Sequence, residues 1–224
     1  MAQNSGITKN QHIKVIPTGV ELNIFAPISR ADARTDESGS DKQVIYFGAG
    51  SLSDPRKGGQ YLAPIVDILN NNLRLRERYM IVAPGYNSSV LDGLDCKIRA
   101  FGHIDNRHKL ALLQASADVT VLPYIEDNLP NVALESLACG TPVCAFAIGG
   151  LKDVVIDGVT GYLARPFDVW DLACKVAKTL ENPPERSRIR SWAESHYDVR
   201  DQAEAYIRLF EDLRLSFKSV TYCS

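Results

Sequence analysis

The chain has 224 residues, a length that allows one sizeable hydrophobic core, or one core with an appendage. Its formal net charge is -2, with 25 Lys and Arg against 27 Asp and Glu, so it lacks the basic field expected of a dedicated nucleic-acid binder. No apolar run approaches the roughly 20 residues that span a bilayer, and residues 1–11 have no apolar stretch typical of a secretory signal.

Cysteine and histidine spacing does not favour a metal or disulfide framework. The five cysteines are odd in number and no two have C-x-x-C spacing, so we expect small buried thiols in a reducing compartment. His103 and His108 are five positions apart, which is not a usual spacing for metal ligands on a helix. We therefore expect a cytoplasmic protein, with a peripheral position of the full-length protein at the membrane left open.

The N-terminal part predicts little regular structure. Residues 1–12 are polar, residues 13–16 (IKVI) predict a short strand, and Pro17-Thr18-Gly19 predicts a turn. Residues 29–42 are polar and charged without large apolar groups, as in a linker. We interpret residues 1–42 as an N-terminal tail and the remnant of an interdomain linker.

From residue 43 onward, short apolar strands alternate with amphipathic helices. This alternation predicts an α/β fold with a Rossmann-like, doubly wound parallel sheet of about six strands. We assign residues 43–196 to this domain and residues 197–224 to a helical C-terminal extension. The predicted strands are 43–47, 79–83, 96–101, 118–123, 142–147 and 162–164, and the predicted helices are 59–69, 107–115, 131–138, 151–156, 170–180, 184–195 and 199–217.

The loop 48–59 (GAGSLSDPRKGG) follows the first of these strands and precedes a helix. It lacks the order of a Walker A motif, and Ser53 stands where a dinucleotide fingerprint has its third glycine. Arg56 and Lys57 stand at the expected helix start, where positive charge is unfavourable unless an anion offsets it. The pair therefore indicates a diphosphate site, and a solvated basic pair is the alternative.

The segment 127–146 (DNLPNVALESLACGTPVCAF) predicts a helix that begins near Pro130, with unpaired backbone N–H groups at its start. Asp127 precedes the helix, and Glu135 lies about one turn inside it. A carboxylate can accept two hydroxyl hydrogen bonds, as a ribose diol requires. Two acids at this spacing also arise by chance, so the signal depends on the helix start, on Pro130 and on the buried strand that follows.

This segment resembles the E-x7-E signature of retaining GT-B glycosyltransferases of the glycogen-synthase-like group. Other parts of the chain resemble the same family: IPTGVELNIFAP (16–27), PRKGGQYL, IRAFGHID, ADVTVLP and FAIGGLKDVVIDGVTGYL. The resemblance covers roughly residues 13–215. It implies that the chain is the donor-binding, C-terminal half of a GT-B fold, acting on a nucleotide-diphosphate sugar.

The resemblance also implies roles for individual residues. Glu135 would bind the ribose hydroxyls, Asp127 would face the donor sugar near its reacting carbon, and Lys57, with Arg56, would neutralise the diphosphate leaving group. His103 and Ile104 would flank the base. The remaining donor contacts would come from Gly50, Gly85, Asn128, Leu129, Asn131 and Val132. The donor would be a UDP- or GDP-sugar, the acceptor a glycan or a lipid-linked molecule, and no metal or other cofactor would be required.

The chain departs from the family pattern at several points. Asp127 stands in place of the usual glutamate, Ala49 and Gly50 stand where an arginine is often found, and Tyr124 replaces a serine. The acceptor-binding N-terminal domain of a complete GT-B enzyme does not precede residue 13, so we expect weak nucleotide binding and little turnover from this chain alone. A GT-B phosphorylase or epimerase, and a non-catalytic module that binds nucleotide sugar or a partner, remain the alternatives.

The C-terminal helix carries an apolar stripe. In the family this helix crosses back to the N-terminal domain, so we expect the stripe to form an exposed patch or to dock elsewhere, with packing on its own domain as the alternative. The stripe consists of Val199, Ala203, Tyr206, Leu209, Phe210 and Leu213.

Overall fold

A computed structural model describes residues 13–29 and 42–221, and the side chains up to residue 215. Its six strands form one parallel sheet in the order β3-β2-β1-β4-β5-β6, the order of a doubly wound nucleotide-binding fold. The predicted fold class is confirmed. The strands are β1 (Gln43–Tyr46), β2 (Tyr79–Pro84), β3 (Lys97–Gly102), β4 (Val119–Leu122), β5 (Val143–Phe146) and β6 (Gly161–Ala164).

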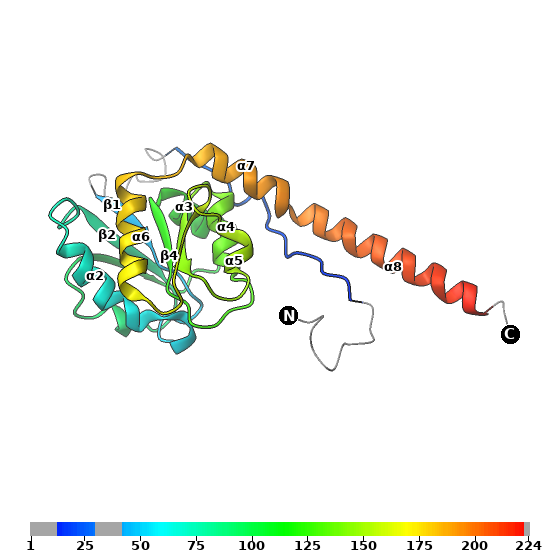
Figure 1. The fold of residues 1–224 in the computed structure, drawn as a ribbon, viewed down its shortest axis with the longest axis horizontal. Helices are drawn as coiled ribbons and strands as arrows, with labels where there is room; N and C mark the ends of the chain where they lie inside the picture. Colours follow the sequence, from blue (N-terminus) through cyan, green and yellow to red (C-terminus); the bar gives the residue numbers. More distant parts are fainter. Residues whose placement is uncertain (1–12, 30–41, 222–224) are drawn as a thin grey trace.

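Helices cover both faces of the sheet (Figure 1). Because side chains alternate along a strand, β1 and the residue that follows it supply both faces: Val44 and Tyr46 belong to the cluster with Leu113, whereas Ile45 and Phe47 belong to the main core. The helices are α2 (Leu62–Asn70), α3 (Arg107–Ser116), α4 (Asn131–Ala138), α5 (Leu151–Val154), α6 (Val169–Glu181), α7 (Arg186–His196) and α8 (Val199–Thr221), with short 3-10 helices η2 (Pro55–Lys57), η3 (Gly59–Tyr61) and η4 (Ser88–Leu91).

Three sequence predictions about local structure were wrong. Residues 13–16 form no strand, because no neighbouring strand pairs with them among the described residues. The helix expected from residue 59 begins at Leu62, after η2 and η3, so Arg56 and Lys57 lie in a preceding 3-10 turn and not at the start of α2. The helix expected over 151–156 ends at Val154.

Part of the predicted linker is bound to the domain. The guanidinium group of Arg190 in α7 donates to the carbonyl oxygens of Phe25 (2.7 Å), Leu22 (3.1 Å) and Ala138 (2.7 Å). The Phe25 side chain is fully buried. Residues 22–25 therefore belong structurally to the same body as the sheet.

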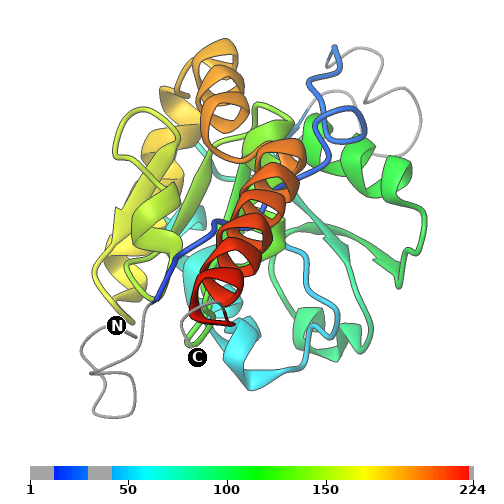
Figure 2. The ribbon, with the colours of Figure 1, turned by 90° about the vertical axis from the view of Figure 1, so that its right-hand side faces the viewer.

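Helix α8 runs away from the rest of the domain (Figures 1 and 2). Tyr206, Phe210 and Leu213 are 42%, 62% and 46% exposed, so the apolar stripe does form an exposed patch, and packing on its own domain is excluded for these three side chains. Over the described part of the chain, no helix combines the length and apolarity needed to cross a lipid bilayer.

Candidate functional site

The carboxyl ends of β1, β2 and β3 face a cavity of about 190 Å³. Loops from four parts of the chain meet there, as expected for the ligand edge of a doubly wound sheet. Six of the residues predicted to bind the donor line it: Gly50, Gly85, His103, Ile104, Val132 and Glu135. The remaining lining residues are Tyr46, Gly48, Ala49, Pro84 and Leu110.

Lys57 and Asp127 form an ion pair at the same edge of the sheet. Lys57 Nζ lies 2.6 Å from Asp127 Oδ2, and the two side chains are only 23% and 17% exposed. Two features bring the loops together: Ile125 N donates to Arg56 O (2.7 Å), and Gly58, at φ +69°, lies so close to Pro123 that a Cβ would be 1.7 Å from its carbonyl oxygen. These backbone contacts between the two loops therefore bring Lys57 and Asp127 together.

The loop that carries Asp127 is also fixed from the side of β5. Gly149 has φ +46°, and a Cβ on it would lie 1.9 Å from the carbonyl oxygen of Asp127. Gly150 N donates to Asn128 O (2.6 Å). The Gly149-Gly150 pair therefore lets the 127–129 loop pack against the end of β5, with Asn128 exposed and Leu129 packed on the core.

Helix α4 starts beside this loop, as predicted. Pro130 occupies the N-cap in an extended conformation (ψ 126°), and no side chain caps the helix. Asn131, the first helical residue, is exposed, and Val132 faces the cavity. The start of α4 thus lies beside the cavity and next to the loop of Asp127, and the backbone N–H groups that a helix start leaves unpaired are suited to an anion.

Glu135 lies in the second turn of α4 and accepts a hydrogen bond at Oε2 from Gln114 Nε2 of α3 (3.0 Å). Gln114 is fully buried, and its Nε2 is also 3.4 Å from the hydroxyl oxygen of Tyr46. Burial raises the pKa of Glu135, although the hydrogen bond from Gln114 and the charge of Arg107 act in the opposite direction.

Arg56 does not face the cavity. Its guanidinium group pairs with Asp54 (2.8 Å) and is 65% exposed, and the backbone N–H of Arg56 donates to the same carboxylate (3.0 Å). This pairing lowers the pKa of Asp54, chiefly through the side-chain hydrogen bond. Of the two predicted basic residues, only Lys57 is half-buried at the sheet edge.

Tyr124 is a residue whose contribution the sequence did not reveal. It follows β4, and its buried hydroxyl donates to Gly48 O (2.7 Å) while Lys57 Nζ lies 4.3 Å from its ring centroid. The phenol therefore connects the cavity wall with the Lys57–Asp127 pair. The available signals were its position directly after a predicted strand and its replacement of the serine usual in the family.

Tyr86 is a second such residue. Its ring stacks on His103, with centroids 4.2 Å apart and planes 7° apart. His103 Nε2 also lies 2.8 Å from Asp105 Oδ1, so the imidazole is held from its edge and from one face. A base expected to lie near His103 would meet an aromatic surface already fixed in orientation.

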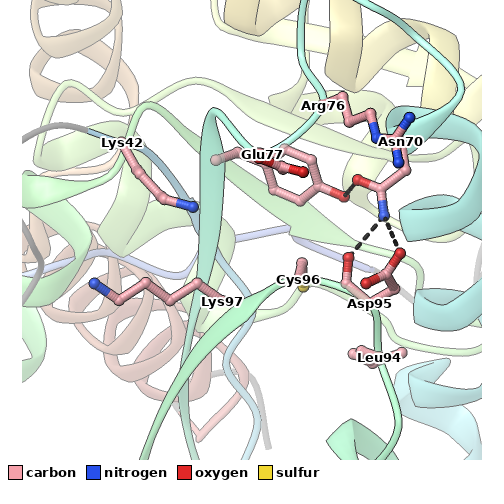
Figure 3. Close-up of a pocket in the computed structure, with 9 residues that line it drawn as sticks. Lys42, Asn70, Arg76, Glu77, Leu94, Asp95, Cys96 and Lys97 are labelled. Atoms are coloured by element: carbon pink, nitrogen blue, oxygen red, sulfur yellow. Dashed lines mark hydrogen bonds between the residues drawn. The ribbon is translucent and has the colours of Figure 1, made fainter.

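Another cavity, of about 350 Å³, lies at the amino ends of β1, β2 and β3 (Figure 3). There the Tyr79 hydroxyl donates to Asn70 Oδ1 (3.0 Å), and Asn70 Nδ2 donates to Asp95 O (2.7 Å). None of the predicted site residues lines this cavity. Within the described ranges, no three His, Cys, Asp or Glu side chains gather as a group able to hold a metal ion.

The sequence of the chain is similar to those of known glycosyltransferases. The chain is 31% identical over 195 residues to a D-inositol 3-phosphate glycosyltransferase of Streptosporangium roseum, covering 81% of this chain and 44% of that protein. The chain spans about half the length of the curated relatives it matches.

Solved structures share the fold. Sucrose-phosphate synthase of Thermosynechococcus elongatus superposes with a TM-score of 0.78 at 24% identity, over 93% of this chain and 54% of that one. Anabaena HepE in complex with UDP-glucose gives a TM-score of 0.72 at 19% identity, over 89% and 57% of the two chains. The sequence profile of the family described as "Glycosyl transferases group 1" matches residues 41–182. The chain belongs to this family of glycosyltransferases.

Proposed function

We propose that this chain is the donor-binding half of a retaining hexosyltransferase that transfers a sugar from a nucleotide-diphosphate sugar to a glycan or lipid-linked acceptor. The observation that carries the proposal is the joint position of the cavity lined by Glu135 and the Lys57–Asp127 pair at one edge of the sheet. A ligand that spans both must combine a polar, diol-bearing end with an anionic centre, as a nucleoside diphosphate does.

Each end of such a ligand meets suitable chemistry. Glu135 offers a carboxylate to the ribose hydroxyls, and the His103–Tyr86 stack and Ile104 offer an apolar surface to the base. Lys57 and the N–H groups at the start of α4 offer positive charge to the diphosphate. Stabilisation of the charge that develops on the leaving diphosphate is the contribution we assign to Lys57.

Asp127 is assigned to the donor sugar. It lies beside the start of α4, and its Oδ2 is already paired with Lys57. A diphosphate that binds Lys57 would compete with Asp127 for the ammonium group. The carboxylate of Asp127 would then face the sugar that the diphosphate carries. In this scheme the aspartate is the group nearest to the reacting carbon, and retention of configuration is part of the proposal.

The donor is proposed to be a UDP-sugar, with a GDP-sugar as the alternative that the same site chemistry allows. The support for UDP is the fold shared with Anabaena HepE, whose structure was solved in complex with UDP-glucose.

The acceptor is proposed to be held by a second domain that packs on this one. The relatives are about twice as long as the chain, and the exposed stripe on α8 offers an apolar surface for such a domain. The cavity of about 190 Å³ is smaller than the roughly 300–1,000 Å³ typical of complete small-molecule sites, as expected if a second domain supplies the other wall.

Calorimetric titration of the chain with UDP, GDP and their glucose and mannose derivatives tests the proposal. We expect measurable binding of one nucleotide series, and a loss of about 1.5–3 kcal/mol of binding free energy in Glu135→Ala. Transfer of the sugar is expected after addition of the amino-terminal half of a related enzyme. Binding by neither series would refute the proposed site, and binding without transfer would favour a non-catalytic nucleotide-sugar module.

A further inference from the structure

Gln114 is a buried polar residue on an otherwise apolar face of α3. It lies between Leu113 and Ala115, and none of the three is more than 2% exposed. Its backbone oxygen lies in the last turn of α3 and accepts from Thr141 Oγ1 (2.7 Å). Its side chain lies toward Glu135 and Tyr46 at the cavity. A residue chosen for packing alone would be apolar here, so the amide calls for an explanation.

The orientation of this amide is unfavourable except toward an ionised carboxylate. Oε1 of Gln114 is buried with no hydrogen-bond partner in the described part of the chain, which is costly for a polar atom. A rotation of the amide by about 180° would place Oε1 against Oε2 of Glu135, and two acceptor oxygens repel each other. The charge-assisted hydrogen bond from Nε2 to the carboxylate offsets the unpaired oxygen.

The same hydrogen bond determines which carboxylate oxygen is available. Oε2 of Glu135 is occupied by Gln114, while Oε1 is bonded to no group of residues 13–29 and 42–215. Because Glu135 lines the cavity, Oε1 is the oxygen left for a ligand. The Tyr46 hydroxyl, also in the cavity wall, accepts from Gln114 and keeps its own proton, since burial raises the pKa of this phenol.

We propose that Gln114 is a positioning residue that fixes Glu135 for the recognition of a ribose, so that the chain discriminates ribonucleotides from 2′-deoxyribonucleotides. The inference rests on the proposed function, because it takes Glu135 as the group that binds the diol. It adds a residue on a different helix, α3, which does not touch the nucleotide and acts through the carboxylate.

The experiment compares affinities for UDP and dUDP, and for GDP and dGDP, by calorimetry on the full chain. We expect the wild-type chain to prefer one ribonucleotide over its 2′-deoxy counterpart by on the order of tenfold. Gln114→Met should reduce this ratio to about twofold while the affinity for inorganic pyrophosphate stays unchanged. Gln43→Met is the matched control, because Gln43 donates to Leu180 O (2.6 Å) at the opposite end of the sheet.

Gln114→Glu is a second variant that keeps the shape of the side chain. At acid pH its carboxyl group would be protonated and would donate a hydrogen bond to Glu135. As the pH rises, both groups become carboxylates and repel each other. The ribose preference of this variant should therefore fall with rising pH. His103 lines the same cavity as Glu135, so the ratio of the wild-type chain at each pH is the reference for the variant. Tyr46 and Cys139 keep their protons over this range, because burial raises the pKa of Tyr46 and raises that of Cys139 to about 12.

The outcomes distinguish the positioning role of Gln114 from the proposed role of Glu135. If Gln114→Met keeps the wild-type ratio while Glu135→Ala abolishes it, the positioning role is wrong and the proposed function stands. If the wild-type chain binds the deoxynucleotide equally well, or Glu135→Ala keeps the wild-type ratio, the ribose role of Glu135 fails and the inference fails with it. Should Gln114→Met not fold, the pH dependence of Gln114→Glu decides, and a ratio independent of pH overturns the inference.

Discussion

Lys57 Nζ lies 2.6 Å from Asp127 Oδ2 although 70 positions of sequence separate the two residues. Replacement of Lys57 by Met removes the half-buried cation at the sheet edge and leaves Asp127 without this partner. We expect the affinity for the bound nucleoside diphosphate to fall by about tenfold to a hundredfold, the usual range for a charged hydrogen bond. Titration calorimetry measures the loss.

Arg56→Met is the control for this prediction. Arg56 is the neighbouring cation, but its guanidinium group is exposed and paired with Asp54, so its loss should change the affinity by less than about threefold. A larger effect of Arg56→Met than of Lys57→Met would mean that the diphosphate lies on the outer side of η2.

The raised pKa of Glu135 predicts a pH dependence of stability. Burial raises this pKa above its usual value of 4.5, so the folded chain binds the proton more tightly than the unfolded chain does. The resulting stabilisation is fully present below pH 4.5 and is lost as the pH rises through the folded-state pKa. Glu135→Gln should therefore gain stability relative to the wild type with rising pH, measured by urea denaturation at a series of pH values. A constant difference would argue against the shift.

Gly149 predicts a steric effect on the site loop. Gly149→Ala combines an unfavourable positive φ with a Cβ 1.9 Å from the carbonyl oxygen of Asp127, whereas Gly158→Ala at φ +74° meets no atom closer than 4.0 Å. Both variants carry the backbone cost of about 1–2 kcal/mol, and only the first adds an overpacking cost of about 1–3 kcal/mol. Urea denaturation of the two should differ by that second amount. Equal stabilities would show that the 127–129 loop can move to accommodate the added Cβ without a cost in stability.

Arg186 predicts a large contribution to stability. Its guanidinium group donates to the carbonyl oxygens of Ala115 (2.7 Å), Ala117 (3.0 Å) and Cys139 (3.1 Å), and so joins the ends of α3 and α4. Arg186→Leu leaves these carbonyl groups without the cation and should lower the free energy of unfolding by about 3 kcal/mol. Arg188→Leu, two positions away and exposed, should change it by less than about 0.5 kcal/mol. Thermal and urea denaturation decide between them.

The exposed stripe on α8 predicts that a substitution there leaves the stability of the chain unchanged but weakens its association with an amino-terminal domain. Phe210 is 62% exposed, so Phe210→Asp should alter the free energy of unfolding by no more than about 0.5 kcal/mol, whereas Ile189→Asp in the core should unfold the chain. Phe210→Asp should weaken binding of an added amino-terminal domain, measured by analytical ultracentrifugation. An undiminished affinity would place that domain on another surface.

The sequence predicted the sheet well because buried parallel strands are short apolar runs separated by amphipathic helices. It failed at residues 13–16, where an apolar run has no strand beside it, and at η2, because a three-residue 3-10 turn has no periodicity to detect. Glu135 and Lys57 were found through their places near predicted helix starts, and the resemblance to a known family assigned their roles. Gln114 and the Tyr86–His103 stack were not, because their meaning lies in contacts between elements far apart in the chain.

The position of β1 between β2 and β4 has a consequence for folding kinetics. β1 can pair with β2 after a short excursion of the chain, but its other edge waits for β4, with Ile45 opposite Val119. Closing that longer loop costs more entropy, so we expect the β1–β4 seam to assemble after the β1–β2–β3 unit. The Lys57–Asp127 contact joins the loops that follow β1 and β4, so amide protection during refolding should appear at this contact and at the β1–β4 pairing last.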